Sequence, residues 1–190
     1  MKRDSGEIPA KTIYTVGHST RAFDDFVAVL RSFEIQAVAD VRLVPKSRRH
    51  PHFADEFLAA NLPRHGIAYL PFKHLGGRRR PRKDSRNVGW RNDSFRGYAD
   101  FMETAAFAAA LDELMAAAAE RATTTMCAEA VPWRCHRSLI SDALLVRGWR
   151  VMDQMDVGKA TPHKLTKFAR VEGTDISYPP EEPQLFEGLA

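Results

Sequence analysis

The sequence has no long run of apolar residues. A membrane-spanning helix needs roughly 20 mostly apolar residues, whereas the apolar runs here are short, and one of them, 116–119, is only alanine. The N-terminal segment 1–11 carries charges without an apolar centre, so we expect a flexible tail there and no secretory signal. The sequence therefore predicts no association with a membrane.

Cysteine is scarce as well: the 190 residues include only Cys127 and Cys135. A small number of cysteines in a chain without a secretory signal is typical of a reducing compartment. We therefore expect a cytoplasmic protein with free thiols.

Positive charge is in small excess overall but is concentrated in one segment. The net charge is +4, while 76–96 contains eight Lys and Arg against two Asp, so that segment carries +6 and the remainder −2. Arg78 and Arg79 follow two glycines, and Trp90 offers a ring on which a base can stack. A local basic segment favours a phosphate-bearing partner, and the alternative is a solvated basic loop.

The hydrophobic pattern predicts five strands, at 12–16, 36–41, 67–72, 123–127 and 149–155. Helical patterns lie at 23–33, 53–65, 95–103, 104–121 and 139–146, with Ser19, Thr20 and Thr104 as candidate N-caps. This alternation indicates a single α/β domain over 12–155, with a mostly parallel sheet of about five strands between helix layers, a Rossmann-like three-layer sandwich. The segment 76–96 is a basic insert, and 156–190 is an extension expected to pack on the surface or to be partly disordered.

Polar and reactive side chains follow the ends of the predicted strands. Parallel strands point their carboxyl ends to one edge of the sheet, which is where α/β proteins bind ligands. The residues at that edge are His18, Ser19, Asp40, Arg42, His74, Cys127 and Glu129, and Arg48 and Arg49 follow in the basic loop after the second strand. The sequence therefore predicts one shared site.

A helix start adds a second binding feature. Cys135, His136, Arg137 and Ser138 lie where the helix after the fourth strand begins. Free backbone N–H groups, the helix dipole and an arginine together favour an anion. The alternative is an ordinary helix start capped by Ser138, with Arg137 paired to an acidic neighbour.

The two cysteines admit several interpretations. Cys127 is either a small buried apolar residue or a nucleophile whose pKa is lowered by cationic neighbours. A cysteine-phosphatase loop is disfavoured, because six residues without glycine separate Cys127 from Arg134. A redox pair of Cys127 and Cys135 would form a disulfide, for which the Cα atoms should lie within about 7 Å.

A metal site is a further alternative, because Cys127, Glu129, Cys135 and His136 are residue types that bind metals. The spacing of the cysteines is long for structural zinc, so we predict no metal and no required cofactor.

A series of motifs resembles the domain of unknown function 488 family over roughly residues 13–179. The motifs are VGHS at 16–19, DVR at 40–42 with PKSRR at 45–49, LGGR at 75–78, YADFM at 98–102, MCAE at 126–129 and CHRS at 135–138, followed by PHKLT at 162–166 and YP at 178–179. The resemblance implies a compact α/β fold and supplies no agreed activity. Near the last strand, where the family often carries a histidine, this chain has Asp153.

These observations predict a pocket that binds a nucleotide or nucleic acid, with an enzymatic activity left open. The candidate catalytic residues are His18, Asp40, Cys127 and Glu129, with Glu129 or His18 as the base. The candidate anion- and substrate-binding residues are Ser19, Arg42, Arg48, Arg49, His74, Arg78, Arg79, Trp90, Cys135, His136, Arg137 and Ser138. The alternatives are a non-catalytic nucleic-acid-binding module and a metal-binding or thiol redox-sensing protein.

Overall fold

A six-stranded sheet forms the centre of the protein, whose computed structural model describes residues 11–46 and 49–180. The strand order is β3-β2-β4-β1-β5-β6; strands β1 to β5 run parallel, and β6 is antiparallel to β5. The strands are β1 Thr12–Gly17, β2 Ala37–Asp40, β3 Ala68–Pro71, β4 Thr123–Cys127, β5 Arg150–Asp156 and β6 Lys159–Pro162. The predicted α/β fold with a mostly parallel sheet is confirmed.

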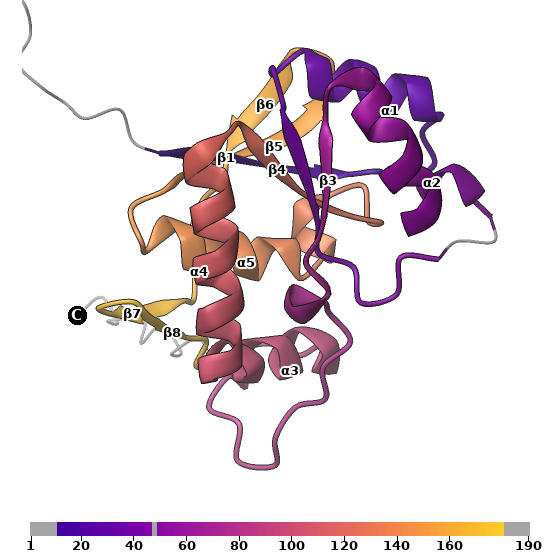
Figure 1. Ribbon diagram of the computed structural model, residues 1–190. Helices are drawn as coiled ribbons and strands as arrows, with labels where there is room; N and C mark the ends of the chain where they lie inside the picture. The colour runs from indigo at the N-terminus through magenta and orange to yellow at the C-terminus, as the bar shows by residue number, and fades with distance from the viewer. Residues whose placement is uncertain (1–10, 47–48, 181–190) are drawn as a thin grey trace, which may run out of the picture.

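Helices cover both faces of the sheet (Figure 1). The described residues form α1 Phe23–Arg31, α2 Asp55–Asn61, α3 Asp93–Met102, α4 Ala105–Glu120 and α5 Arg137–Leu145. On one face, Phe26 and Leu30 of α1 and Leu58 of α2 belong to one buried cluster. On the other, Leu111 of α4 and Leu139 of α5 belong to a second cluster. None of the helices in the described part is long and apolar enough to cross a membrane.

Strand β4 lies between β2 and β1, and all five of its residues are buried. Its three threonines suit a strand covered on both faces, since β-branched side chains pack well on a pleated surface. Thr124 also donates its hydroxyl to Gln154 of β5 at 2.9 Å, which satisfies a polar group inside the sheet. The strand ends at Cys127, so this residue stands at the middle of the carboxyl edge.

Local details differ from the expected helix boundaries. The segment 53–65 is α2 flanked by the 3₁₀ turns Pro51–Phe53 and Leu62–His65, because Pro63 lacks the N–H that a continuing helix requires. Helix α1 starts after Ala22 without a side-chain cap, so Ser19 and Thr20 are not its caps. Thr104 does cap α4, accepting a hydrogen bond from the Phe107 amide at 3.2 Å.

The extension after β5 contains strands that the sequence did not predict. β6 adds an antiparallel edge to the sheet, and β7 Arg170–Glu172 pairs with β8 Asp175–Ser177 as a hairpin. Tyr178 is buried, and its amide donates to the side chain of Asn87 at 2.9 Å. Over 156–180, the extension thus packs on the domain.

The basic insert 76–96 is tied to α3 (bottom of Figure 1). Glu103 pairs with Arg82 and with Arg86. Asp100 accepts hydrogen bonds from the Arg82 amide at 2.8 Å and from the Asn87 side chain at 2.9 Å. Part of the positive charge of the insert is therefore neutralised by the carboxylate of Glu103, directly after α3.

Candidate functional site

A pocket of about 320 Å³ opens at the carboxyl edge of the sheet. The segments after β2, β3 and β4 line it, together with the start of α3 and the loop before α5. Its polar and reactive residues are Arg42, Arg78, Ser94, Cys127, Glu129, Arg134, Cys135 and His136, and its apolar wall includes Leu43, Val44 and Phe95. The carboxyl edge thus holds a pocket where the sequence predicts one, although only part of the predicted residue set lines it.

Asp40 and Arg42 form a buried ion pair beside this pocket. Arg42 donates from Nε to Oδ1 of Asp40 at 2.8 Å and from Nη2 to Oδ2 at 2.5 Å. Tyr69 donates its hydroxyl to the same Oδ2 at 2.8 Å. Because Asp40 is only 1% exposed, its carboxylate is in position to hold Arg42 rather than to contact a ligand.

His18 is a neutral ring whose two nitrogens are both engaged. Nδ1 lies 2.9 Å from the Ser19 carbonyl, which can only accept, so Nδ1 carries the hydrogen and Nε2 accepts from Arg42 at 3.2 Å. Burial, reinforced by Arg42, lowers the pKa of His18 to about 4. The ring also stacks on Phe53, with centroids 4.1 Å apart. His18 does not line the pocket.

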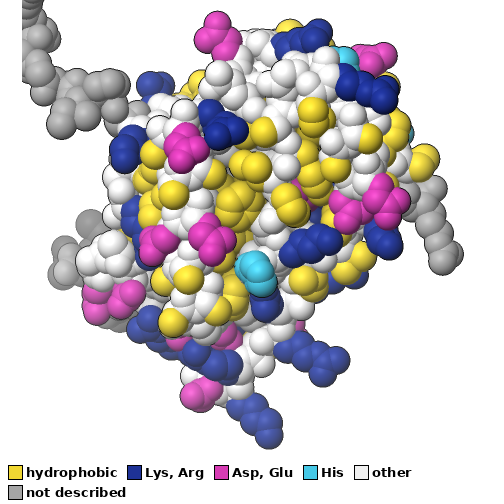
Figure 2. Space-filling view, in the orientation of Figure 1, with side chains coloured by type: hydrophobic (Ala, Val, Ile, Leu, Met, Phe, Trp, Pro, Cys, Tyr) yellow, Lys and Arg dark blue, Asp and Glu magenta, His cyan; other side chains and the backbone are white. Residues whose placement is uncertain are grey.

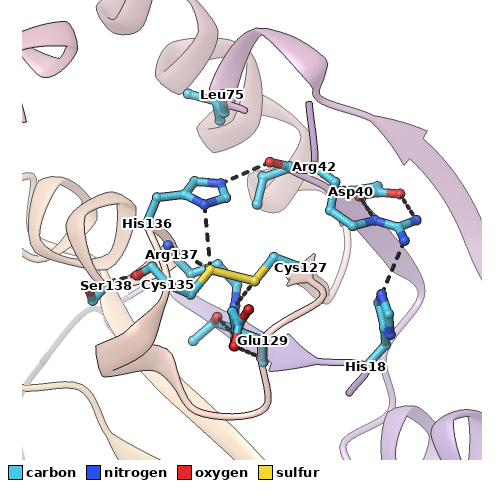
Figure 3. The surroundings of a disulfide bond; sticks show 12 residues. His18, Asp40, Arg42, Leu75, Cys127, Glu129, Cys135, His136, Arg137 and Ser138 are labelled. Atoms are coloured by element: carbon cyan, nitrogen blue, oxygen red, sulfur yellow. Dashed lines mark hydrogen bonds and ion pairs between the residues drawn. A yellow bond between two sulfur atoms is a disulfide. The ribbon is translucent and has the colours of Figure 1, made fainter. Parts of the chain in front are cut away.

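Cys127 and Cys135 are joined by a disulfide at the pocket (Figure 3). The expectation of free thiols is therefore wrong for this structure. The 3₁₀ turn Pro132–Arg134 turns the chain back, so that Cys135 faces the end of β4. The Cα atoms lie 7.7 Å apart, which is wider than the expected limit of about 7 Å.

Arg137 lies beneath the disulfide with 1% of its surface exposed. Its guanidinium donates to Cys127 Sγ at 3.1 Å, to Thr15 Oγ1 at 2.7 Å and to the Glu129 carbonyl at 2.8 Å. None of these partners is a carboxylate, and Arg137 forms no ion pair with any described residue. Burial lowers the pKa of Arg137 to about 10.

His136 connects the cysteine pair to the end of β2. Nε2 lies 2.9 Å from the Val41 carbonyl and therefore carries the hydrogen, while Nδ1 is the acceptor and faces Cys135 Sγ at 3.5 Å. Burial lowers the pKa of His136 to about 4, so the ring is neutral at pH 7.

Two glycines permit the close packing of these segments. A Cβ on Gly17 would lie 1.8 Å from the Glu129 carbonyl oxygen, and a Cβ on Gly77 would lie 2.9 Å from Nδ1 of His136. The motifs at 16–19 and 75–78 therefore bring backbone against the cysteine loop and His136, which explains why glycine is needed in each.

Backbone amides at the start of α5 are already hydrogen-bonded to nearby carbonyls. The amides of Ser138 and Leu139 donate to the carbonyls of Cys135 and His136 at 3.0 and 3.1 Å. Ser138 donates its hydroxyl to the Cys135 carbonyl at 3.0 Å and does not cap the helix. The pairing of Arg137 with the side chain of Glu129 or Asp40, which was the alternative to an anion site, is also absent.

Several predicted ligand-binding residues lie away from the pocket. His74 is exposed, and its carbonyl accepts from Arg79, whose guanidinium also covers the ring of Phe101 at 3.8 Å. Trp90 stacks on Phe95, with centroids 4.7 Å apart, inside an aromatic cluster rather than on an open surface.

Two further candidates lie outside the pocket lining, and a third falls outside the described residues. Ser19 has a positive φ of 51°, and its amide donates to the Ala128 carbonyl at 3.0 Å, so it packs β1 against the cysteine loop. Arg49 is exposed outside the pocket lining, and Arg48 lies outside the described residues.

No group of three or more His, Cys, Asp or Glu side chains is arranged to hold a metal within the described ranges. Cys127, Glu129, Cys135 and His136 line the same pocket, but two of these four side chains are consumed by the disulfide.

Two residues reach the pocket through features that the sequence alone does not reveal. Arg134 lies in the cysteine loop, but its place on the pocket depends on the 3₁₀ turn before Cys135. Phe95 has the ordinary pattern of a helix residue, and nothing in the sequence places α3 against the carboxyl edge. Thr15 does not line the pocket but accepts a hydrogen bond from Arg137, and as a polar residue inside a buried strand it could have been singled out from the sequence.

Comparison with known proteins matches this chain to one family. Residues 22–144, more than half of the chain, match the family described as domain of unknown function DUF488. No match was found among curated proteins or solved structures. The matched region runs from the start of α1 into α5 and includes β2, β4, the pocket and both cysteines. The chain therefore belongs to the DUF488 family, whose function is unknown.

Proposed function

We propose that the pocket at the carboxyl edge binds a small phosphate-bearing molecule of nucleotide size. The observation that carries the proposal is the state of Arg78 and Arg134. Both are exposed, both line the pocket, and neither guanidinium makes a hydrogen bond or ion pair with a described residue. An arginine without a carboxylate partner keeps its charge and its planar set of donors, which match the oxygens of a phosphate.

The rest of the pocket supports this ligand class. Its volume of about 320 Å³ is near the lower end of the usual range for small-molecule sites, about 300–1,000 Å³. Arg42 adds a third guanidinium, whose charge Asp40 offsets. Leu43, Val44 and Phe95 provide apolar surface for a base or another ring.

The same pocket has one group suited to proton transfer. Glu129 is the only carboxylate among the lining residues, and its side chain has no hydrogen-bond or ion-pair partner in the described chain. His18 is less suited, because accepting a proton at Nε2 requires Arg42 to move away. If the protein acts on its ligand, Glu129 is the residue that we expect to be the base.

Titration calorimetry with inorganic pyrophosphate and with adenosine monophosphate tests this proposal. We expect binding of at least one probe, weakened about tenfold or more by Arg134→Gln or Arg78→Gln, because each removes a charge-assisted contact. Arg80→Gln is the matched control, since Arg80 is exposed in the same segment but does not line the pocket. Absence of binding for both probes, or equal weakening by the control, would reject the proposal.

A nucleic-acid partner is the second candidate, and the surface of the basic insert favours it. Arg78, Lys83 and Arg91 are exposed, and their side chains form no hydrogen bond or ion pair with a described residue. Figure 2 shows Lys and Arg side chains projecting at the lower end of the molecule, where Figure 1 places α3 and the insert. This candidate predicts binding of a single-stranded oligonucleotide that weakens steeply with salt, and Lys83→Gln should reduce the salt slope by roughly one.

A further inference from the structure

The buried guanidinium of Arg137 has no carboxylate to balance its charge. A buried cation normally has an ionic partner, because removing it from water costs several kcal/mol. Asp153 and Glu129 attract Arg137 electrostatically, but both carboxylates lie beyond ion-pair distance. The acceptor at 3.1 Å from Nε is instead the sulfur of Cys127. A thiolate at that position would be the missing counter-ion.

Other cationic residues near Cys127 also favour its thiolate. Arg42 at the end of β2 and Arg134 in the cysteine loop line the same pocket, and Glu129 is the carboxylate that opposes them. A thiol beside cationic groups ionises at lower pH than a free cysteine. Although only 3% of Cys127 is exposed, it lines the pocket, so a small reagent has a route to the sulfur.

Cys135 is placed to complete a redox pair. Its sulfur is bonded to Cys127, accepts from the Arg137 amide at 3.5 Å and faces the unprotonated Nδ1 of His136, also at 3.5 Å. When the bond is reduced, the Cys135 thiol can therefore hydrogen-bond to His136 while Cys127 keeps the guanidinium.

We propose that Cys127 and Cys135 form a reversible dithiol–disulfide couple, with Cys127 as the nucleophilic thiolate, Cys135 as the resolving cysteine, and a small disulfide bearing acidic groups as the substrate class. The preference for acidic groups rests on the proposed function, because it uses the same arginines of the pocket. The assignment of the two cysteines rests on Arg137 and is independent of it.

The exchange balances with this substrate as the oxidant. The Cys127 thiolate attacks one sulfur of the small disulfide, forms a mixed disulfide and releases one thiolate. The Cys135 thiol gives its proton to solvent or to the departing thiolate, attacks Cys127 Sγ and releases the second thiolate. Two thiols are thus oxidised to one protein disulfide while one small disulfide is reduced to two thiols. In the reverse direction Cys135 is displaced first, and the last step releases Cys127 as the thiolate that Arg137 stabilises.

Reaction of the reduced protein with one equivalent of dithiobis(nitrobenzoate), an acidic disulfide, tests the pair. The wild-type protein should release two nitrothiobenzoate ions per protein and end with the internal disulfide and no adduct by mass spectrometry. Cys135→Ser should release one ion and retain a mixed disulfide on Cys127. Cys127→Ser should react at least about tenfold more slowly at pH 7, since an ordinary thiol is only a few per cent ionised there.

A second arm measures the pKa of Cys127 and tests the role of the pocket arginines. In Cys135→Ser, the pH dependence of alkylation by iodoacetamide should place the Cys127 pKa below the ordinary value of about 8.5. Arg78→Gln and Arg134→Gln should slow the reaction of the reduced protein with dithiobis(nitrobenzoate) but not its reaction with the uncharged dithiodipyridine. Arg80→Gln should slow neither reaction.

Each outcome has a defined meaning. The pair is rejected if Cys135→Ser releases as many ions as the wild type, or if Cys127 titrates as an ordinary thiol. Equal effects of the arginine changes on both reagents reject the acidic substrate class. Failure of the phosphate probes in calorimetry, with the preference for the acidic disulfide intact, rejects the proposed function and leaves the redox pair standing.

Discussion

At the scale of single residues, the site depends on which groups balance the positive charge of its buried arginines. Arg42 has Asp40 as a two-point partner, whereas Arg137 has two oxygens and a sulfur. The first arrangement is a complete ion pair that fixes a pocket residue. The second leaves a positive charge beside a cysteine, which is why we assign the chemistry to Cys127 rather than to His18 or Asp40.

Asp40→Asn tests whether Asp40 is the counter-ion that stabilises the buried guanidinium of Arg42. The change leaves a buried guanidinium without its counter-ion, so we expect a loss of about 3–5 kcal/mol in the free energy of unfolding. Urea denaturation gives this value. Asp93→Asn is the control, because Asp93 pairs with Arg96 on the exposed surface of α3 and its loss should cost less than about 1 kcal/mol. Similar costs for the two changes would contradict the structural role of Asp40.

At the scale of elements, α3 organises the basic insert. Asp100 accepts hydrogen bonds from the Arg82 amide, Ser85 and Asn87, and Glu103 pairs with two arginines of the insert. A segment that the sequence marks only as basic and irregular is therefore held in one arrangement. This arrangement leaves Arg78 free at the pocket while Arg82 and Arg86 are neutralised.

Asp100→Ala should release the insert without unfolding the sheet. The three lost hydrogen bonds are worth roughly 1 kcal/mol each, so the segment should open more often. Limited trypsin digestion should cut after Arg82, Lys83 or Arg86 at least about tenfold faster than in the wild type. Asp84→Ala serves as the control, because the Asp84 side chain is 88% exposed and lies 3.7 Å from Arg82. Unchanged cleavage in Asp100→Ala would mean that other contacts hold the insert.

At the scale of the whole molecule, a buried charge cluster fastens the extension to the domain. His163 of the extension lies 2.9 Å from Asp142 of α5 and 3.5 Å from Asp153 of β5, and Tyr178 donates its hydroxyl to Asp142 at 2.9 Å. Burial alone would lower the pKa of His163, but the two carboxylates outweigh it and raise the pKa to about 9. The folded protein therefore holds His163 protonated at neutral pH.

This cluster predicts a loss of stability at alkaline pH. Because the pKa of His163 is raised from 6.5 to about 9 on folding, its contribution is fully present below pH 6.5 and is lost as the pH rises through 9. We expect the urea midpoint to fall between pH 7 and 10, and His163→Gln to have a lower midpoint at pH 7 but a flatter alkaline dependence. An equally steep fall in His163→Gln would assign the effect to other groups.

The local sequence determined the helices and strands of the domain up to β5 and the residues at which these strands end, whereas the strands of the extension were not predicted. The β-branched pattern of 123–127, the alanine-rich stripe of 105–120 and the cap at Thr104 are short-range properties, and they predicted β4 and α4 closely. The alternation of strands and helices then implied parallel strands and a shared carboxyl edge, which the strand pairing confirms.

Only the tertiary structure decided which of the converging residues open on the pocket and which are buried beside it. His18, Asp40 and Arg137 follow the predicted pattern, yet packing directs them inward, while Arg134 and Phe95 reach the pocket through a turn and a distant helix. The bond between Cys127 and Cys135, and the placement of Arg137 beneath it, depend on contacts between β1, β4 and α5. A local pattern specifies the type of residue at a strand end, but its direction and partners arise from side chains far away in the chain.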